Sequence, residues 1–173
     1  STWLKDFVRA DEISEKIKAR IIGKARFANE ASIILEILNL APAGCNIFIG
    51  NSLPVRDLDI FFSNSSKRLA IHFNRGASGI DGISSTALGV ALNKKPAILI
   101  TGDLSFLHDL NALQVATKYE IPLTIIVINN NGGGIFESLP IAKKVNRVRE
   151  YFITPHNIDL SLVVKSFGIS YQL

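Results

Sequence analysis

The chain has 173 residues, of which 47% are hydrophobic and 20% are charged. This composition supports a buried core of ordinary size and excludes a disordered chain. The 19 basic and 15 acidic side chains are scattered along the sequence and give a net charge of +4, so we expect no nucleic-acid partner. No apolar run reaches the ~18 residues that a membrane span requires. The single cysteine, Cys45, excludes an internal disulfide and is expected to be a small, buried, apolar residue.

Two amphipathic stretches open the chain. Residues 10–22 and 29–41 carry apolar side chains at three-to-four spacing and predict helices, the second of which ends near Pro42 and Gly44. The sequence contains no Met and stops within an apolar run. We therefore expect it to be a piece of a longer protein.

Four short apolar runs bounded by turn residues predict buried strands, at residues 46–50, 69–73, 96–101 and 123–129. Helical patterns lie at residues 78–93, 106–120 and 158–168. Strands that alternate with helices in this way predict an α/β domain built on a doubly wound parallel sheet.

Polar residues follow the third and fourth predicted strands. Asp103 comes directly after Gly102, and Asn130 follows it by 27 residues. A right-handed crossover of that length brings both residues to the carboxyl edge of the sheet, where ligands bind in such folds. A carboxylate, an amide oxygen and a main-chain carbonyl among the glycines at 132–134 make half an octahedron for Mg²⁺, and a helix beginning near Ser105 would turn free N–H groups toward a diphosphate. The plainer interpretation is a helix cap and an ordinary glycine loop.

The pairing of Gly-Asp with an Asn after the next strand resembles the motif of thiamine-diphosphate enzymes. Most of those enzymes have Gly-Asp-Gly, whereas this chain has Gly-Asp-Leu-Ser, as does the family of 2-succinyl-5-enolpyruvyl-6-hydroxy-3-cyclohexene-1-carboxylate synthases (MenD). Four segments in order are similar to signatures of that family: "GNSLPVRDLD" (50–59), "NRGASGIDG" (74–82), "GDLSFLHDLNAL" (102–113) and "NNNGGGIFESLP" (129–140). The chain is therefore identified as a member of this family.

The resemblance implies the site residues. It implies that residues 41–173 form the diphosphate-binding domain, truncated at its C-terminus. Thiamine diphosphate would bind there with Mg²⁺, or with Mn²⁺ in its place, and the metal ligands would be Asp103, Asn130 and the main-chain carbonyl of Gly132. Other cofactor contacts fall on Gly102, Leu104, Ser105, Ile135 and Ile80, the last of which would wedge under the bent cofactor. Substrate contacts fall on Ser52, Arg56, Arg75, Ile135 and Phe136.

The resemblance also implies an activity. The family consists of transferases that decarboxylate 2-oxoglutarate and add the succinyl unit to isochorismate, in menaquinone or phylloquinone biosynthesis. Both substrates are dianions, which guanidinium groups are suited to hold. The activating glutamate of the family lies on a separate N-terminal domain, and the active site forms between the subunits of a dimer or tetramer. Residues 1–40 would then approach from a missing central domain, and this chain would hold no catalytic residue and show no turnover alone. The compartment would be a bacterial cytoplasm or a plastid stroma.

Two alternatives remain open. Another thiamine-diphosphate enzyme, such as an acetolactate synthase or an oxo-acid decarboxylase, would carry Gly-Asp-Gly and would lack the contexts of Arg56 and Arg75. A non-catalytic nucleotide-binding module would need Gly-x-Gly-x-x-Gly after the first strand, and "GNSLPV" does not supply it. The three histidines, His72, His108 and His156, receive no role.

Overall fold

The fold is that of a computed structural model, which describes residues 1–25, 29–62, 67–93 and 95–173. The chain forms two compact units, and one of the boundaries between them falls within a helix, α3 (Leu53–Phe61). The first unit comprises Ser1–Ala41 and Arg56–Ser66, and the second comprises Pro42–Val55 and Lys67–Leu173.

The first unit is helical. Its first helix, α1 (Thr2–Lys24), begins earlier than the predicted helix at residues 10–22, and none of its residues is buried. The predicted second helix is present as α2 (Glu30–Leu40). A reciprocal cap starts it: the Asn29 side chain accepts the N–H of Ser32, and the Ser32 hydroxyl oxygen accepts the N–H of Asn29, both at 3.0 Å. Such a capping box satisfies two backbone donors at a helix start.

A buried carboxylate lies in the first unit, in α3, a helix that the sequence did not predict. Burial and, to a smaller extent, the negative charge of Glu30 raise the pKa of Asp57 to about 6. Oδ2 of Asp57 has no hydrogen-bond partner among the residues that the structure describes.

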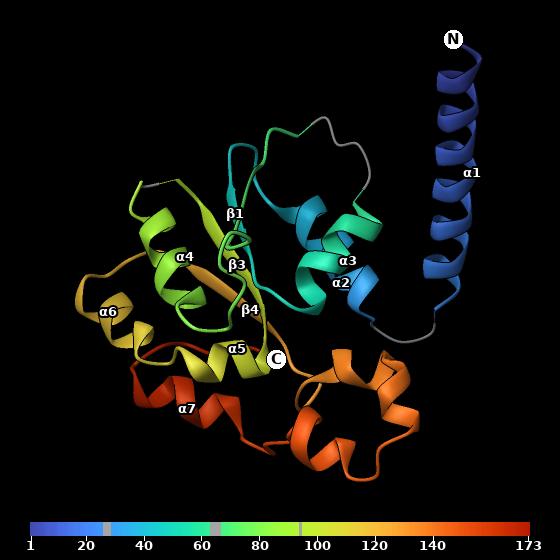
Figure 1. The fold of residues 1–173 in the computed structure, drawn as a ribbon. Coiled ribbons are helices and arrows are strands. Elements are labelled where there is room, and N and C mark those ends of the chain that lie inside the picture. Colours follow the sequence, from blue (N-terminus) through green and yellow to red (C-terminus); the bar gives the residue numbers. More distant parts are fainter. Residues whose placement is uncertain (26–28, 63–66, 94) are drawn as a thin grey trace. The chain divides into compact units, whose positions relative to one another are not determined.

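The second unit contains the predicted parallel sheet (Figure 1). Its strands are β1 (Asn46–Ile49), β2 (Ala70–Phe73), β3 (Ala97–Gly102) and β4 (Thr124–Ile128), close to the four predicted runs. They lie in the order β2-β1-β3-β4, and each neighbouring pair is parallel. The chain passes outward from β1 to β2 and then returns to the other side of β1 for β3. The strand order therefore reverses between β1 and β3, and in such sheets ligands bind beyond the carboxyl ends of the strands at this reversal.

Two apolar clusters hold helices against this sheet. The first joins α4 (Ile83–Ala91) to β1 and β3 through Phe48, Ile83, Ala87 and Leu99. The second joins the helices after β3 and the last helix, α7 (Leu160–Ser166), through Phe106, Leu113, Leu160 and Val164. Ile125 and Val127 of β4 pack against this second cluster. The helices thus fix β3 and β4, the two strands that lead into the predicted site.

Cys45, directly before β1, is fully buried, as predicted from its type. Burial raises the pKa of its thiol, so the group stays neutral and behaves as a small apolar side chain.

The single helix predicted over residues 106–120 is wrong. The chain forms α5 (Asp103–His108) and α6 (Ala112–Lys118), and α5 begins at Asp103 instead of near Ser105. Between them, the Asp109 carboxylate accepts the backbone N–H of Ser85 at 2.7 Å and its hydroxyl at 3.0 Å. Ser85 lies in the first turn of α4, where N–H groups have no partner within the helix. The break between α5 and α6 thus lets Asp109 cap a different helix.

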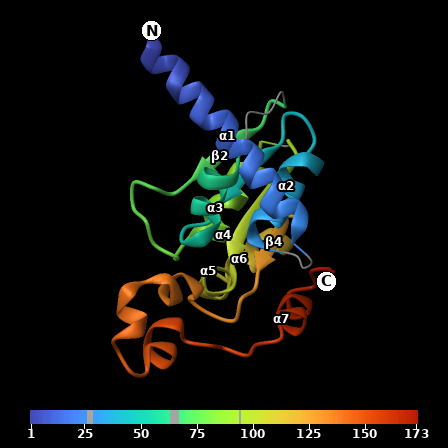
Figure 2. The same ribbon diagram turned by 90° about the vertical axis from the view of Figure 1, so that its right-hand side faces the viewer.

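The segment after β4 forms three short helical turns, Gly134–Ser138, Pro140–Lys143 and Arg149–Ile153, before the chain reaches α7. Figures 1 and 2 show these turns in orange, past the carboxyl end of β4. Among the described parts of the chain, no helix combines the length and the apolar character needed to cross a membrane.

Candidate functional site

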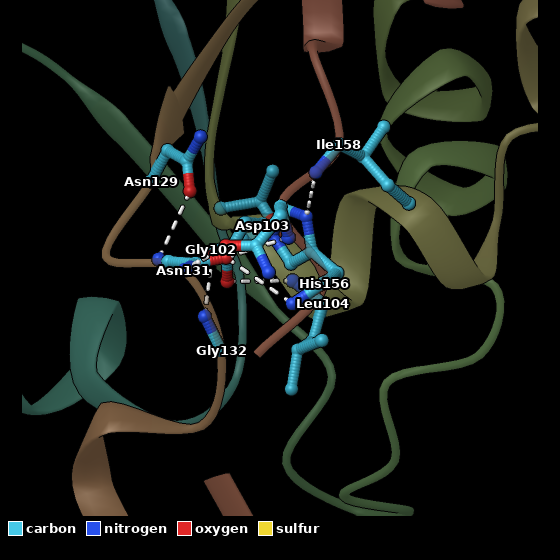
Figure 3. A network of polar contacts seen from close by, with 10 residues as sticks. Gly102, Asp103, Leu104, Asn129, Asn131, Gly132, His156 and Ile158 are labelled. Carbon is cyan, nitrogen blue, oxygen red and sulfur yellow. Dashed lines mark hydrogen bonds and ion pairs between the residues drawn. The ribbon is translucent and has the colours of Figure 1, made fainter. Parts of the chain in front are cut away.

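Asp103 occupies the carboxyl end of β3 as the first residue of α5, directly after Gly102 (Figure 3). Its side chain is only 2% exposed. Oδ2 accepts the backbone N–H of Gly132 at 2.8 Å, and Oδ1 accepts the backbone N–H of Leu104 at 2.7 Å. Since β3 and β4 are neighbours, the loop after β4 comes directly over the carboxylate. The structure therefore brings together Asp103 and Gly132, which are 29 positions apart.

The conformation of Gly132 requires a glycine. Its φ is +134°, and a Cβ atom there would collide with the main-chain oxygen of Ile153. The next residue, Gly133, donates its N–H to that same oxygen at 2.7 Å. The carbonyl of Gly132 accepts the N–H of Gly134 at 3.0 Å. A carbonyl oxygen has two lone pairs, and the described residues occupy one of them here, so the other is left for a ligand.

The asparagines before Gly132 have different environments. Asn130, the predicted amide ligand, is exposed, and its side chain lies against Gly134. Asn129 accepts the backbone N–H of Asn131 at 3.0 Å (Figure 3). Within the described residues, no group of three or more His, Cys, Asp or Glu side chains could hold a metal ion.

His156, to which the sequence assigned no role, contacts Asp103. Its Nε2 lies 3.1 Å from Oδ2 of Asp103, and its Nδ1 accepts the backbone N–H of Ile158 at 2.9 Å (Figure 3). The side chain of Asn131 fixes the backbone here, since Oδ1 accepts the N–H groups of His156 at 3.1 Å and Asn157 at 2.9 Å. His156 is 53 positions from Asp103, and no periodic pattern connects residues so far apart.

A second set of polar contacts joins the loops after β1 and β2. The Asn51 side chain, 5% exposed, donates to the carbonyl of Gly79 at 2.6 Å. Nη1 of Arg75 donates to Oδ1 of Asn51 at 3.2 Å. Gly50 lets the chain leave β1 close to β3, because a Cβ atom there would lie 2.9 Å from Oγ1 of Thr101. The predicted residue Arg75 is thus held beside the strand-order reversal.

The other predicted residues lie on several elements. Ser52 follows Asn51 with a φ of 74° and is half-buried. Ile80 is 37% exposed. Arg56 is an exposed residue of α3 in the first unit.

The apolar residues predicted near the reacting carbon lie past β4. Ile135 and Phe136 are half-buried in the turn Gly134–Ser138, and the ring of Phe136 meets the edge of Phe152, with 5.9 Å between centroids. Ser105, predicted as a cofactor contact, is buried in α5. His108 is exposed near the end of that helix.

Comparison with known proteins identifies related chains. Residues 62–172 match the family described as "Thiamine pyrophosphate enzyme, C-terminal TPP binding domain". The chain is 44% identical over 166 residues to the 2-succinyl-5-enolpyruvyl-6-hydroxy-3-cyclohexene-1-carboxylate synthase of Trichormus variabilis, covering 96% of this chain and 27% of that protein. The enzyme of the same name from Roseiflexus castenholzii is 39% identical over 174 residues, covering 99% of this chain and 30% of that protein. This chain thus spans less than a third of the length of the curated relatives that it matches.

A solved structure shares the fold. The X-ray structure of an enzyme from Mycobacterium smegmatis, described as thiamin diphosphate-dependent, superposes with a TM-score of 0.61 and 17% sequence identity. The match covers 81% of this chain and 25% of the other. At this identity the likeness concerns the fold alone.

Proposed function

This chain belongs to the thiamine pyrophosphate enzymes through their C-terminal TPP binding domain, and we propose that it supplies the Mg²⁺-diphosphate half of the active site of a MenD-type synthase. One observation carries the proposal: the buried Asp103 carboxylate, at the carboxyl end of β3, accepts the N–H of Gly132 in the loop after β4. This hydrogen bond joins the two neighbouring strand ends that carry the proposed oxygen ligands.

The residues at this edge suit a hard cation. Among the described residues, Oδ1 of Asp103 has one donor, the N–H of Leu104, and the carbonyl of Gly132 also has one, the N–H of Gly134. Each oxygen keeps a lone pair that could bind a cation. Mg²⁺ takes few protein oxygens and completes its shell with phosphate and water, so Asp103, Gly132 and the side chain of Asn130 are the ligands that we propose.

The reaction that we propose is the decarboxylation of 2-oxoglutarate and the addition of the succinyl unit to isochorismate. The high identity to synthases of that name supports it. Thiamine diphosphate, when bound, supplies the carbon that accepts the 2-oxo acid and stabilises the charge left after CO₂ departs. Arg75 would hold a substrate carboxylate, since its guanidinium is already oriented by Asn51. Ile135 and Phe136 would exclude water from the reacting carbon.

The remaining assignments are proposals of the same kind. Ser52 and Arg56 would contact substrate, and Ile80 would contact the cofactor. The full-length enzyme would be a homodimer or homotetramer in a bacterial cytoplasm or a plastid stroma, with the glutamate that activates the cofactor outside this chain.

Calorimetric titration of thiamine diphosphate tests the proposal directly. We expect the full chain to bind the cofactor with Mg²⁺ present and much more weakly with a chelator. Asp103→Ala should abolish the Mg²⁺-dependent binding of thiamine diphosphate, because it removes the only charged ligand of the proposed set. Asp109→Ala is the matched control, since Asp109 caps α4 and should leave binding intact. A folded wild-type chain without Mg²⁺-dependent binding would contradict the proposal.

A further inference from the structure

His156 and Asp103 form a buried pair at the carboxyl end of β3. Nε2 of the imidazole lies 3.1 Å from Oδ2 of the carboxylate, and the two side chains are 9% and 2% exposed. A group on α5 is thereby joined to the irregular segment before α7, 53 positions later in the chain (Figure 3). Buried side chains that meet at hydrogen-bond distance hold each other in one orientation.

The hydrogen bonds of His156 define its tautomer. Nδ1 accepts the backbone N–H of Ile158 at 2.9 Å, so this nitrogen carries no hydrogen. The ring hydrogen of the neutral imidazole then sits on Nε2, from which it is donated to Oδ2 of Asp103. Asn131 fixes the backbone of His156 from the loop that also carries Gly132.

The donors to Asp103 are unevenly divided between its two oxygens. Oδ2 accepts two hydrogens, from Gly132 and from His156, which fill both of its lone-pair directions. Oδ1 accepts one, from Leu104, and retains one direction. Within the described part of the chain, these three contacts hold the carboxylate and leave only Oδ1 with a free lone-pair direction for a cation.

We propose that His156 is a positioning residue for the cation that binds with the diphosphate: by occupying Oδ2, it presents Oδ1 of Asp103 to Mg²⁺. This inference rests on the proposed function. Without the imidazole, Oδ2 would lose one of its two donors and the carboxylate could turn. Its affinity for the cation would fall, because ligands that are not held by a partner bind metals more weakly.

Two substitutions separate the two hydrogen bonds of the ring. His156→Asn places an amide oxygen near the position of Nδ1, so it retains the acceptor for Ile158 and is too short to reach Asp103. His156→Gln places an amide N–H near the position of Nε2 and retains the donor to Asp103. If His156 positions Asp103, His156→Gln should retain the Mg²⁺ affinity that His156→Asn loses.

The measurement is the affinity for Mg²⁺ of the full chain at saturating thiamine diphosphate, by calorimetry, together with the thermal midpoint of the ligand-free chain. For His156→Asn we expect Mg²⁺ affinity to fall by about 10- to 100-fold, the range typical of lost ligand partners, with little change in the midpoint. His156→Gln should regain most of the affinity. A nitrogen-15 correlation spectrum of the ligand-free wild-type ring should show the hydrogen on Nε2.

The possible outcomes distinguish the two proposals. Unchanged Mg²⁺ affinity in His156→Asn, or equal losses in both variants that follow the thermal midpoint, would overturn the positioning role and leave the proposed function standing. A ring hydrogen on Nδ1 would also overturn it. A folded wild-type chain that binds no Mg²⁺ and thiamine diphosphate would overturn both.

Discussion

At the scale of single residues, Asp57 makes the stability of the first unit depend on pH. Its folded pKa of about 6 lies above the ordinary value of 3.8, because burial and Glu30 disfavour the charged form. The folded state therefore binds the proton more tightly than the unfolded state does. The resulting loss of stability is fully present above pH 6 and disappears as the pH falls from there toward 3.8.

Asp57→Asn should reduce this dependence. We expect the wild-type chain to lose on the order of 2 kcal/mol of unfolding free energy through Asp57 between pH 4 and pH 7, and the variant to lose correspondingly less. Urea unfolding followed by circular dichroism at both pH values measures the difference. Asp59→Asn, at an exposed position of the same helix, removes the same charge without burial and should retain the wild-type slope. Identical slopes for wild type and Asp57→Asn would contradict the assignment.

At the scale of elements, the chain leaves β1 at Gly50, where it runs so close to β3 that there is no room for a side chain. A Cβ atom on Gly50 would lie 2.9 Å from Oγ1 of Thr101 and 3.2 Å from the carbonyl of Ile100, closer than ordinary contact. Gly50→Ala should lower the unfolding free energy by about 1–3 kcal/mol, the usual range for overpacking. Urea denaturation at constant pH provides the measurement.

Gly89 provides the matched substitution. It lies in the interior of α4, and a Cβ atom there has nothing within 4 Å. Gly89→Ala should therefore raise the unfolding free energy by about 0.5–1 kcal/mol through helix propensity alone. If Gly50→Ala and Gly89→Ala changed the unfolding free energy in the same direction, the effect of Gly50→Ala could not be assigned to the close approach of β1 to β3.

At the scale of the whole molecule, the chain spans less than a third of the length of the relatives that it matches. We expect it to bind thiamine diphosphate and to release no CO₂ from 2-oxoglutarate, because the family resemblance places the activating glutamate on another domain. A coupled CO₂ assay with saturating cofactor and Mg²⁺ tests this, with Asp103→Ala as the background. Release by the wild type alone would show that the chain contains all the groups that decarboxylation needs.

Sequence patterns predicted the strands and their parallel arrangement well, because each strand is a local apolar run with turn residues at both ends. The same local signal placed Asp103 and Asn130 just past the ends of strands, where the structure has them. The sequence patterns did not predict which strands lie on the two sides of β1. That order depends on where the helices pack, and those contacts join residues far apart in the chain.

The errors have the same origin. Residues 106–120 form one good helical pattern, yet the chain breaks into two helices there, and Asp109 at the break caps α4. No local pattern could predict the contact of His156, because its partner, Asp103, lies 53 positions away. In both cases the tertiary hydrogen bonds join residues far apart in the chain, which a local pattern does not register.

The hydrogen bonds of the segment between Thr154 and Asp159 have a consequence for where a minimal binding unit could end. A chain cut after Ile153 would keep all four strands and every oxygen of the proposed metal site. It would lose the imidazole of His156, which contacts Asp103. It would also lose the backbone N–H groups of His156 and Asn157, which donate to the Asn131 side chain. If the proposed function holds, the smallest piece that binds the cofactor well would have to include this stretch of chain, which belongs to no strand or helix. Boundaries drawn from the sheet alone would cut it away.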